Sequence, residues 1–242
     1  MDIVESLGFR LIKDDLSIVP LDQRVLINTI SPNSYGIAVN DPLMHDSLAK
    51  ADYLVLDGMY FGLAPLLLNG QHVKRFAGWD CFRYFSAKMN EKHGKVLFLG
   101  STEETLALIR KKFRDEYPNV EVETYSPPFR DVFTDEDHQK MRLAINAFRP
   151  DVVFVGLTAP KQEKWGYQNK EFLDVHIICA IGNVFDWYAG NAKRPGVFWQ
   201  KAGLEWLIRI FYRPEVFRRN ISNQMLFFWH LLLYVLKIKK HD

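Results

Sequence analysis

The chain has 242 residues, and its 48% hydrophobic and 25% charged fractions are those of a folded globular protein rather than a disordered one. The formal net charge of +2 is too small to favour nucleic acid as a partner. The two cysteines, Cys81 and Cys179, cannot form a disulfide framework and favour a reducing compartment. Residues 1–20 lack the pattern of a signal peptide, and the apolar run Met225–Leu236 is shorter than the roughly 20 residues of a membrane-spanning helix.

Five short apolar runs that end in small or polar residues predict buried strands. In chain order they are Val25–Ile27, Tyr53–Leu56, Val96–Leu99, Val152–Val155 and His176–Ala180. Helix-length stretches accompany them, the clearest being Pro42–Lys50, Asp80–Lys92, Glu103–Tyr117, Asp135–Phe148 and Pro160–Phe172. This alternation predicts an α/β fold with a parallel sheet and helices on both of its faces.

The pattern changes near residue 195. No strand-like run follows, and Phe198–Tyr212 and Glu215–Leu236 are predicted to be helices that are separated at Arg213-Pro214. We therefore expect two parts, an α/β domain of residues 1–195 and a helical appendage of residues 196–242.

The expected appendage differs from the rest of the chain in charge. From Lys201 to Asp242 it contains eight Lys or Arg and three acidic residues, a net charge of +5, whereas the first 200 residues sum to −3. It also contains large aromatic residues, among them Trp206, Phe227, Phe228 and Trp229. A basic, aromatic segment that is too short to span a bilayer is typical of a helix lying on an anionic membrane surface.

Several motifs that would identify other classes of protein are absent. The chain has no GxGxxG or GxxxxGK[ST] segment for nucleotides, no HExxH or CxxC pair for zinc, and no GxSxG for a nucleophilic serine. The triplet Asp135-Glu136-Asp137 resembles the acidic motifs that hold a divalent metal with a sugar nucleotide. We favour a helix start for it, because acidic residues there interact favourably with the helix dipole. The sequence therefore predicts no metal site.

Polar residues follow two of the predicted strands, at the edge of a parallel sheet where ligands bind. Thr29, Ser31 and Asn33 follow the first strand and are suited to a sugar or a phosphate, although an ordinary polar loop with a helix cap has the same spacing. Asp57 follows the next strand and precedes Gly58. A carboxylate at this place is either a general base, if burial raises its basicity, or a turn aspartate, and the spacing leaves both open.

Two further strand ends carry candidate binding residues. The strand that ends at Gly156 is followed by a helix start whose N–H groups suit a phosphate, with Lys161 and Gln162 in its first turn, although a plain strand–helix junction has the same pattern. After the last strand come Asn183 and Asp186 with neighbouring aromatic residues, which either stack on a base or sugar or pack under a loop.

The appendage contributes four arginines, at Arg209, Arg213, Arg218 and Arg219, close to Trp and Phe residues. Such arginines suit a membrane-facing helix or a bidentate contact with a diphosphate. A solvated helix face explains them as well, and we expect it for at least half of them.

Taken together, these segments resemble the WecG/TagA/CpsF family of glycosyltransferases, in order and at similar spacing from about Val25 to Arg219. The most specific pieces are Asp57-Gly58, Pro160–Trp165, Gly182–Gly190 and Gly203–Arg209. The resemblance implies a Rossmann-like domain that performs an inverting, metal-independent transfer, with no cofactor, from a UDP-sugar to a polyprenyl-diphosphate-linked sugar. The product would enter a capsule, exopolysaccharide or teichoic-acid type of cell-surface polysaccharide.

The resemblance also implies roles for single residues. Asp57 matches the catalytic base, Thr29 an active-site threonine and Gln162 a contact of the sugar nucleotide. Arg209 and Arg219 resemble appendage arginines that reach the diphosphate. The family's appendage docks on the membrane, so the expected location is peripheral, on the cytoplasmic face of the bacterial cell membrane.

One departure from the family pattern bears on the substrate. The family usually has Thr-x-Asn-x-His where this chain has Thr29-Ile30-Ser31-Pro32-Asn33, so Ser31 replaces an asparagine near the sugars. The identity of the donor sugar therefore stays open, and N-acetylmannosamine is not assumed. The sequence also leaves open whether the protein forms a homo-oligomer. Two alternatives remain: a nucleotide-binding, membrane-associated adaptor without catalysis, and a nucleotide-dependent oxidoreductase, against which the missing glycine fingerprint argues.

Overall fold

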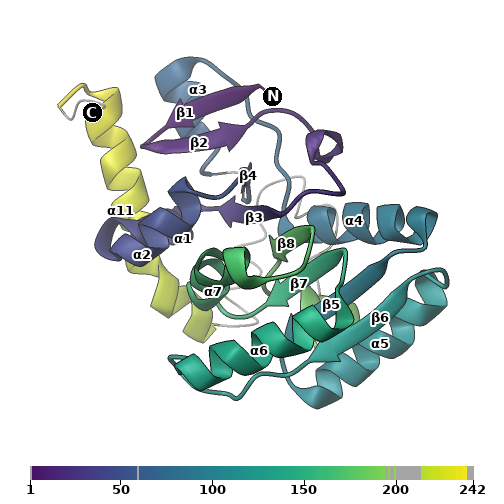
Figure 1. Ribbon diagram of the computed structural model, residues 1–242. Coiled ribbons are helices and arrows are strands. Elements are labelled where there is room, and N and C mark those ends of the chain that lie inside the picture. Colours follow the sequence, from purple (N-terminus) through teal and green to yellow (C-terminus); the bar gives the residue numbers. More distant parts are fainter. Residues whose placement is uncertain (1, 59, 194–195, 197–198, 200–213, 239–242) are drawn as a thin grey trace.

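The protein is described by a computed structural model that covers residues 2–58, 60–193, 196, 199 and 214–238 (Figure 1). The strands of its main sheet are β3 (Val25–Ile30), β4 (Tyr53–Leu56), β5 (Lys95–Gly100), β6 (Glu121–Tyr125), β7 (Val152–Gly156) and β8 (Ile177–Ala180). They lie in the order β4-β3-β8-β7-β5-β6, and every neighbouring pair is parallel. The predicted α/β fold with a parallel sheet is confirmed.

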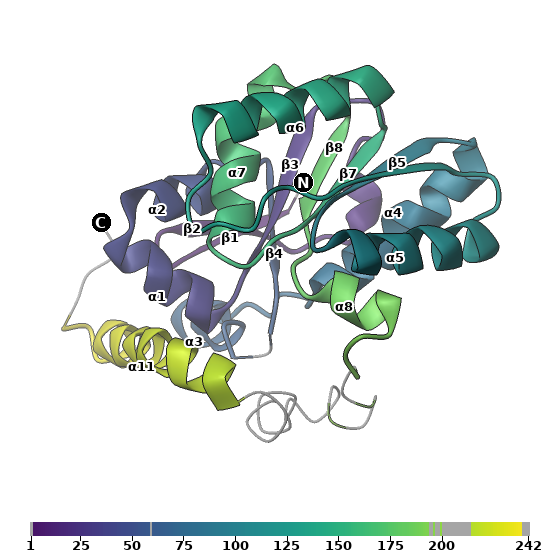
Figure 2. The ribbon, with the colours of Figure 1, turned by 90° about the horizontal axis from the view of Figure 1, so that it is seen from below.

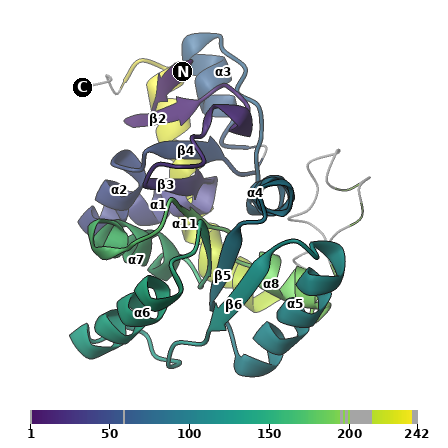
Figure 3. The same ribbon diagram turned by 45° about the vertical axis from the view of Figure 1, so that its right-hand side comes forward.

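Helices cover both faces of this sheet, as the sequence pattern predicts (Figures 2 and 3). One face packs against α4 (Gly78–Lys92), α5 (Glu103–Glu116) and α8 (Val184–Ala189), and the other against α6 (Asp135–Phe148) and α7 (Lys161–Asn169). In β7, Phe154 faces the first group, while Val153 and Val155 face the second. Because both faces are buried, the strands read as continuous apolar runs.

A third layer of elements packs around β4, at one edge of the sheet (Figure 1). It consists of the antiparallel hairpin β1 (Ile3–Ser6) and β2 (Phe9–Ile12), and the helices α1 (Pro32–Asn40), α2 (Pro42–Ala49), α3 (Leu63–Asn69) and α11 (Pro214–Val235). The apolar core of this layer is continuous from the hairpin to α11, which contributes Phe227 and Leu231 to it.

The long helix α11 confirms the helix predicted over Glu215–Leu236 and lies along α1 (Figure 2). The two helices approach closely at Gly36, where a Cβ atom would lie 2.4 Å from the backbone oxygen of Asn223. Asn223 Nδ2 donates to Asn33 Oδ1 over 3.1 Å, and the Tyr35 hydroxyl lies 2.8 Å from His230 Nδ1. These contacts fix the position of α11 on the α/β domain. The predicted helix over Phe198–Tyr212 lies outside the described residues except at Trp199.

The helix starts explain two sequence features. Ser31 caps α1, because its Oγ accepts from the backbone N–H of Ser34 over 3.3 Å. Thr134 caps α6 in a reciprocal pair with Asp137, whose carboxylate accepts from the backbone N–H of Thr134 over 2.8 Å. This bond with the backbone of Thr134 lowers the pKa of Asp137. The acidic triplet is thus the start of a helix, as predicted.

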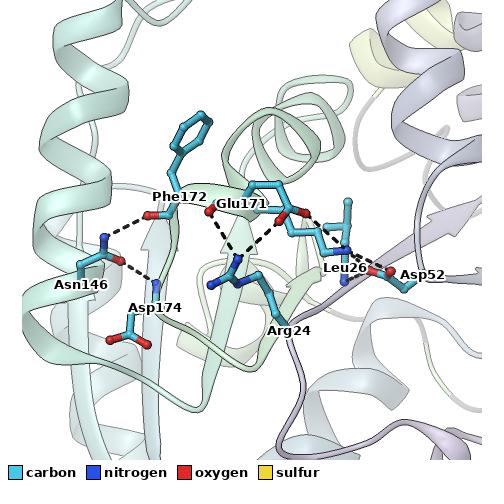
Figure 4. A network of polar contacts seen from close by, with 8 residues as sticks. Arg24, Leu26, Asp52, Asn146, Glu171, Phe172 and Asp174 are labelled. Atoms are coloured by element: carbon cyan, nitrogen blue, oxygen red, sulfur yellow. Dashed lines mark hydrogen bonds and ion pairs between the residues drawn. The ribbon is translucent and has the colours of Figure 1, made fainter.

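At the amino ends of the strands, polar contacts join several segments of the chain (Figure 4). Asp52 accepts from the backbone N–H of Leu26 over 2.6 Å, and Arg24 reaches the backbone oxygen of Glu171 over 3.3 Å. Asn146 donates to Phe172 O over 3.0 Å and accepts from Asp174 N over 2.8 Å. These groups satisfy one another, which leaves the carboxyl ends of the strands as the edge where a ligand can bind.

Candidate active site

A cavity of about 140 Å³ opens at the carboxyl ends of β4, β3 and β8, three neighbouring strands. Its lining comes from the strand ends and from the first turns of α4, α7 and α8. The lining residues are Thr29, Asp57, Arg75, Ala77, Gly78, Trp79, Gln162, Ile181, Gly182, Asn183, Val184 and Trp187. The structure therefore brings together four residues predicted from the sequence: Thr29, Asp57, Gln162 and Asn183.

Asp57 is held in place by β3 on one side and by the segment around Arg75 on the other. Its backbone N–H donates to the backbone oxygen of Ile30 over 2.8 Å, which keeps it in line with the end of β3. The preceding residue, Leu56, pairs in parallel with Arg75, and the N–H of Phe76 donates to Leu56 O over 2.9 Å. The chain after α3 thus returns to the edge of β4 and places Arg75 in the same cavity wall as Asp57.

The helix α4 begins at this cavity. Ala77, Gly78 and Trp79 all belong to the lining, and they are the cap and the first two residues of a helix of 15 residues. Gly78 is packed so closely that a Cβ atom would lie 2.8 Å from the backbone oxygen of Ile181. Asp80, in the first turn, accepts from the backbone N–H of Ala77 over 2.9 Å, so Gly78 and Trp79 carry the N–H groups through which this end of α4 favours an anion. Arg75 supplies a positive charge in the same wall.

The opposite wall is formed around Asn183. With its amide oriented to satisfy its neighbours, Asn183 donates to Asp186 Oδ2 over 2.9 Å and accepts from Trp187 Nε1 over 3.0 Å. Asn183 and Trp187 line the cavity, whereas Asp186 holds the Asn183 amide from behind and does not belong to the lining. The Trp187 indole presents an aromatic surface suited to stacking on a base or a sugar ring.

Gln162 is the part of the wall that α7 provides, and Glu163 supports it from outside the lining. Both side chains are buried, with exposed fractions of 6% and 2%. Gln162 Nε2 donates to Glu163 Oε1 over 2.9 Å, and the Gln162 amide lies against Gly182. Gly182 has a left-handed backbone, with φ of +55°, which favours glycine at this place. Burial raises the pKa of the Glu163 carboxyl, since the charged form is poorly solvated there.

Other residues predicted for the site lie outside the cavity lining. Ser31 caps α1 and Asn33 binds Asn223 of α11. Lys161 Nζ donates to the backbone oxygen of Arg130 over 2.9 Å. Gly156 is packed on an aromatic ring, because a Cβ atom there would lie 2.5 Å from the ring of Phe185.

The appendage arginines divide into two pairs. Arg218 and Arg219 are exposed on the first turns of α11 and do not line the cavity. Arg209 and Arg213 lie outside the described residues.

The sequence pattern did not reveal Arg75 and Trp79, and it left Trp187 open between stacking on a base or sugar and packing under a loop. Residues 71–77 contain neither an apolar run nor a helical period, so nothing in their pattern indicates that they return to the sheet. The signal that could have found them is the glycine and tryptophan at the start of a long amphipathic helix, three and four residues after Arg75.

A larger hollow of about 380 Å³ lies elsewhere, on the outer surface of α5, and is lined by Glu103, Ala107, Arg110, Lys111, Arg114, Asp115 and Thr124. It lies away from the strand ends that carry the predicted residues, and Arg110 is already engaged by Glu123 and Thr124. Charges of both signs occur in its lining, which fits a solvated helix face. We therefore assign the site to the smaller cavity.

The described residues offer no other familiar reactive centre. Within them, no group of three or more His, Cys, Asp or Glu side chains is arranged to hold a metal ion. Cys81 and Cys179 are both buried and free of disulfide bonds. A hydrogen bond with Cys179, together with burial, raises the pKa of the Cys81 thiol and so disfavours its nucleophilic thiolate form.

Comparison with known proteins gives consistent relatives. One is the N-acetylglucosaminyldiphosphoundecaprenol N-acetyl-beta-D-mannosaminyltransferase of Bacillus subtilis, 26% identical over 204 residues, which are 84% of this chain and 78% of the relative. The protein of the same name from Bacillus spizizenii is 27% identical over 224 residues, or 92% of this chain and 82% of the relative. The one from Staphylococcus aureus is 24% identical over 185 residues, or 76% and 71%.

The family model described as the glycosyl transferase WecG/TagA/CpsF family matches residues 11–241, which is nearly the whole chain. The match includes the strand ends that form the cavity as well as α11. The protein therefore belongs to the WecG/TagA/CpsF family of glycosyltransferases.

Proposed function

We propose that this glycosyltransferase moves a sugar from a UDP-sugar to a sugar on a polyprenyl diphosphate, with inversion at the anomeric carbon. The relatives are named for transferring N-acetylmannosamine to N-acetylglucosaminyldiphosphoundecaprenol, so this pair of substrates is the first candidate. The observation that carries the proposal is the convergence of Thr29, Asp57 and Gln162 in one cavity at the carboxyl ends of the sheet.

Inversion by a single displacement requires one base. In the proposed reaction Asp57 accepts the proton of the acceptor hydroxyl while the oxygen of that hydroxyl attacks the anomeric carbon, and the bond to the UDP oxygen breaks on the opposite side. Asp57 suits this role because it is half-buried and fixed by a backbone bond to β3. Thr29, in the adjacent strand, is placed to hold a substrate hydroxyl beside it.

The leaving diphosphate gains negative charge as the bond breaks. Arg75 and the N-terminal end of α4 line the cavity and favour an anion there, so we propose that they stabilise this charge. These two groups take the role that a divalent metal has in many glycosyl transfers, and we propose a metal-independent reaction without a cofactor. Trp79 and Trp187 offer aromatic surfaces for the base or the sugar.

The outer face of α11 supports a peripheral position on the membrane. The side chains that face the core are Phe227 and Leu231, while Met225, Trp229, Leu232 and Leu236 form an exposed stripe with exposed fractions of 47–60%. Phe227, one of the aromatic residues of the expected appendage, does not belong to this outer face, since it is fully buried against Tyr35 and Phe61.

A helix that is apolar on two faces leaves one of them to be covered by a partner. No helix within the described residues is long and apolar enough to span a bilayer. We propose that the exposed stripe lies in the headgroup region of the cytoplasmic leaflet, with Arg218, Arg219 and Lys237 near anionic lipids. This position would bring the cavity to a lipid-linked acceptor.

The proposal is tested by offering a panel of UDP-sugars together with a short-chain polyprenyl-diphosphate N-acetylglucosamine, and by analysing the products by mass spectrometry. The expected result is an acceptor that gains the mass of one sugar residue with one of the donors. NAD and NADP serve as controls, since an oxidoreductase would bind them. Binding of UDP without transfer of any sugar would contradict the proposal and would support the adaptor.

A further inference from the structure

The helix α3 belongs to a segment that leaves the candidate cavity and returns to it. Asp57 begins this segment and Arg75 ends it, and both line the cavity. α3 packs against the hairpin strand β1 and against α11, beside which it lies in Figure 2. Tyr60 is three residues after Asp57, so the Cα atoms of the two lie within about 11 Å of each other. The Tyr60 ring meets Phe228 of α11 edge to face, with 6.0 Å between the ring centroids. The surface of α3 is therefore close to the cavity in which the proposed transfer takes place.

The exposed side of α3 is apolar and uncharged. Leu66 and Leu67 are 45% and 58% exposed, whereas Ala64 and Pro65 are buried. None of the seven residues of α3 is Asp, Glu, Lys or Arg, while eight of the 14 in α5 and five of the 14 in α6 are. All three helices have an exposed side, so exposure alone does not explain why α3 has no charge. A surface of this kind is typical of a contact with an apolar partner.

The charges around this surface favour an anionic lipid leaflet as the partner. Neither residues 58–79, which include α3, nor residues 216–241, which include most of α11, contain an acidic side chain. On the hairpin beside α3, Glu5 is paired with Arg10 over 3.8 Å. α11 adds the exposed cations named above. A second copy of this chain would bring the same acid-free surface and no counter-charge for these cations, whereas lipid phosphates supply it.

We propose that α3 and the exposed stripe of α11 together form one surface that contacts an anionic membrane leaflet, with Leu66 and Leu67 inserted in the headgroup region. This inference rests on the proposed function, in which the acceptor is linked to a lipid. It extends the membrane contact from the appendage to the α/β domain. Contact through both helices holds the cavity between Asp57 and Arg75 at the leaflet surface, which is where the diphosphate of a polyprenyl-linked acceptor lies.

Matched pairs of substitutions in the full chain test this surface. Leu66→Ser/Leu67→Ser removes the exposed leucines of α3, and Leu108→Ser/Leu143→Ser removes leucines of similar exposure, 46% and 62%, from α5 and α6. The Tm confirms folding, and co-sedimentation is measured with vesicles of phosphatidylglycerol and phosphatidylcholine. We expect the α3 variant to bind about 10-fold more weakly than the wild-type protein, a change that the loss of about 55 Å² of inserted apolar surface produces. The control should bind as the wild-type protein does.

A fluorescent label reports whether α3 itself reaches the lipid. Both native cysteines are buried, so an environment-sensitive dye attaches at one position in Leu67→Cys and at one position in the control, Leu108→Cys. We expect the emission to shift to shorter wavelength on vesicles in Leu67→Cys only. An emission that vesicles leave unchanged, or an α3 variant that pellets like the wild type, would overturn the inference. An α3 variant that keeps vesicle binding but changes from oligomer to monomer in light scattering would overturn it as well, in favour of a second copy.

Activity separates this inference from the proposed function. Leu66→Ser/Leu67→Ser should transfer sugar to a short-chain acceptor in solution at the wild-type rate. With a long-chain acceptor in vesicles, at low acceptor concentration, its rate should fall about 10-fold, in line with the weaker binding. Wild-type rates with both acceptors would contradict the inference. If the wild-type protein transfers to neither acceptor, the proposed function fails, while the vesicle and dye measurements still decide whether α3 lies on the membrane.

Discussion

The close contact of α11 with α1 gives a quantitative prediction for Gly36→Ala. The new Cβ atom would lie 2.4 Å from Asn223 O and 2.5 Å from Asn223 Cα, both backbone atoms that cannot rotate away. Ordinary contact begins at 3.4 Å, so α11 has to move outward by about 1 Å. A shift of this size would stretch the bonds of 3.1 Å between Asn223 and Asn33 and 2.8 Å between Tyr35 and His230 beyond hydrogen-bonding distance.

Two opposing effects determine the sign. Alanine in place of glycine inside a helix gains about 1 kcal/mol of intrinsic propensity. Overpacking costs about 1–3 kcal/mol, and each stretched hydrogen bond about 0.5–1.5 kcal/mol. We therefore expect Gly36→Ala to lower the free energy of unfolding by about 2 kcal/mol, which in a chain of this size lowers the Tm by about 4–8 °C.

Urea unfolding followed by circular dichroism measures this change, and hydrogen exchange reports whether the amides of α11 lose protection. Val39→Ala is the matched control, because Val39 lies on the same helix with 43% of its surface exposed and should change the stability little. If Gly36→Ala is more stable than the wild type by about 1 kcal/mol, only the helix propensity has changed. That result would refute the docking of α11 on α1.

The remaining predictions concern metal, membrane and pH. Transfer should continue in EDTA; a loss of activity that manganese or magnesium restores would contradict the metal-independent reaction. Replacing Trp229 and Leu232 of the exposed α11 stripe by Ser should reduce co-sedimentation with anionic liposomes. The control, which replaces the exposed Leu108 of α5 and Leu143 of α6 by Ser, should not reduce it. If the two variants pellet equally, the stripe is not the membrane contact. A raised pKa means that the folded state holds the Glu163 proton more tightly than the unfolded state, so this stabilisation is complete at low pH and is lost as the pH rises through the folded-state pKa. The free energy of unfolding of Glu163→Gln, measured in urea, should not show this decrease as the pH rises. If it depends on pH in the same way as that of the wild-type protein, burial does not raise the pKa of Glu163.

The strands at the centre of the sheet could be predicted because burial on both faces makes their sequences continuously apolar. The bounds predicted for Tyr53–Leu56 are those of β4, while β3 continues three residues past the predicted end, through Asn28, Thr29 and Ile30. The edge strand β6 was missed, because Glu121 and Glu123 alternate with apolar residues and hide the run. The strands of the short hairpin β1–β2 have four residues each, too few for a clear period.

The site could be predicted where residues directly follow parallel strands, since the carboxyl ends of such strands meet at one edge. Thr29, Asp57 and Asn183 were found in this way. Lys161 points elsewhere because successive residues on a helix differ by about 100° in direction, so only its neighbour Gln162 can face the cavity. Arg75 depends on a long-range pairing with Leu56, and a local sequence pattern contains no information about such a pairing.

The central claim is that Asp57 is the base of a sugar transfer in this cavity, and one comparison tests it most directly. The rate of transfer from the UDP-sugar to the polyprenyl-diphosphate acceptor is measured for the wild-type protein and Asp57→Asn, together with the affinity of each for UDP. Loss of a general base reduces turnover by about 10²–10⁴-fold, while the neutral isostere should leave UDP affinity within a few-fold. An Asp57→Asn protein that keeps wild-type turnover would contradict the account.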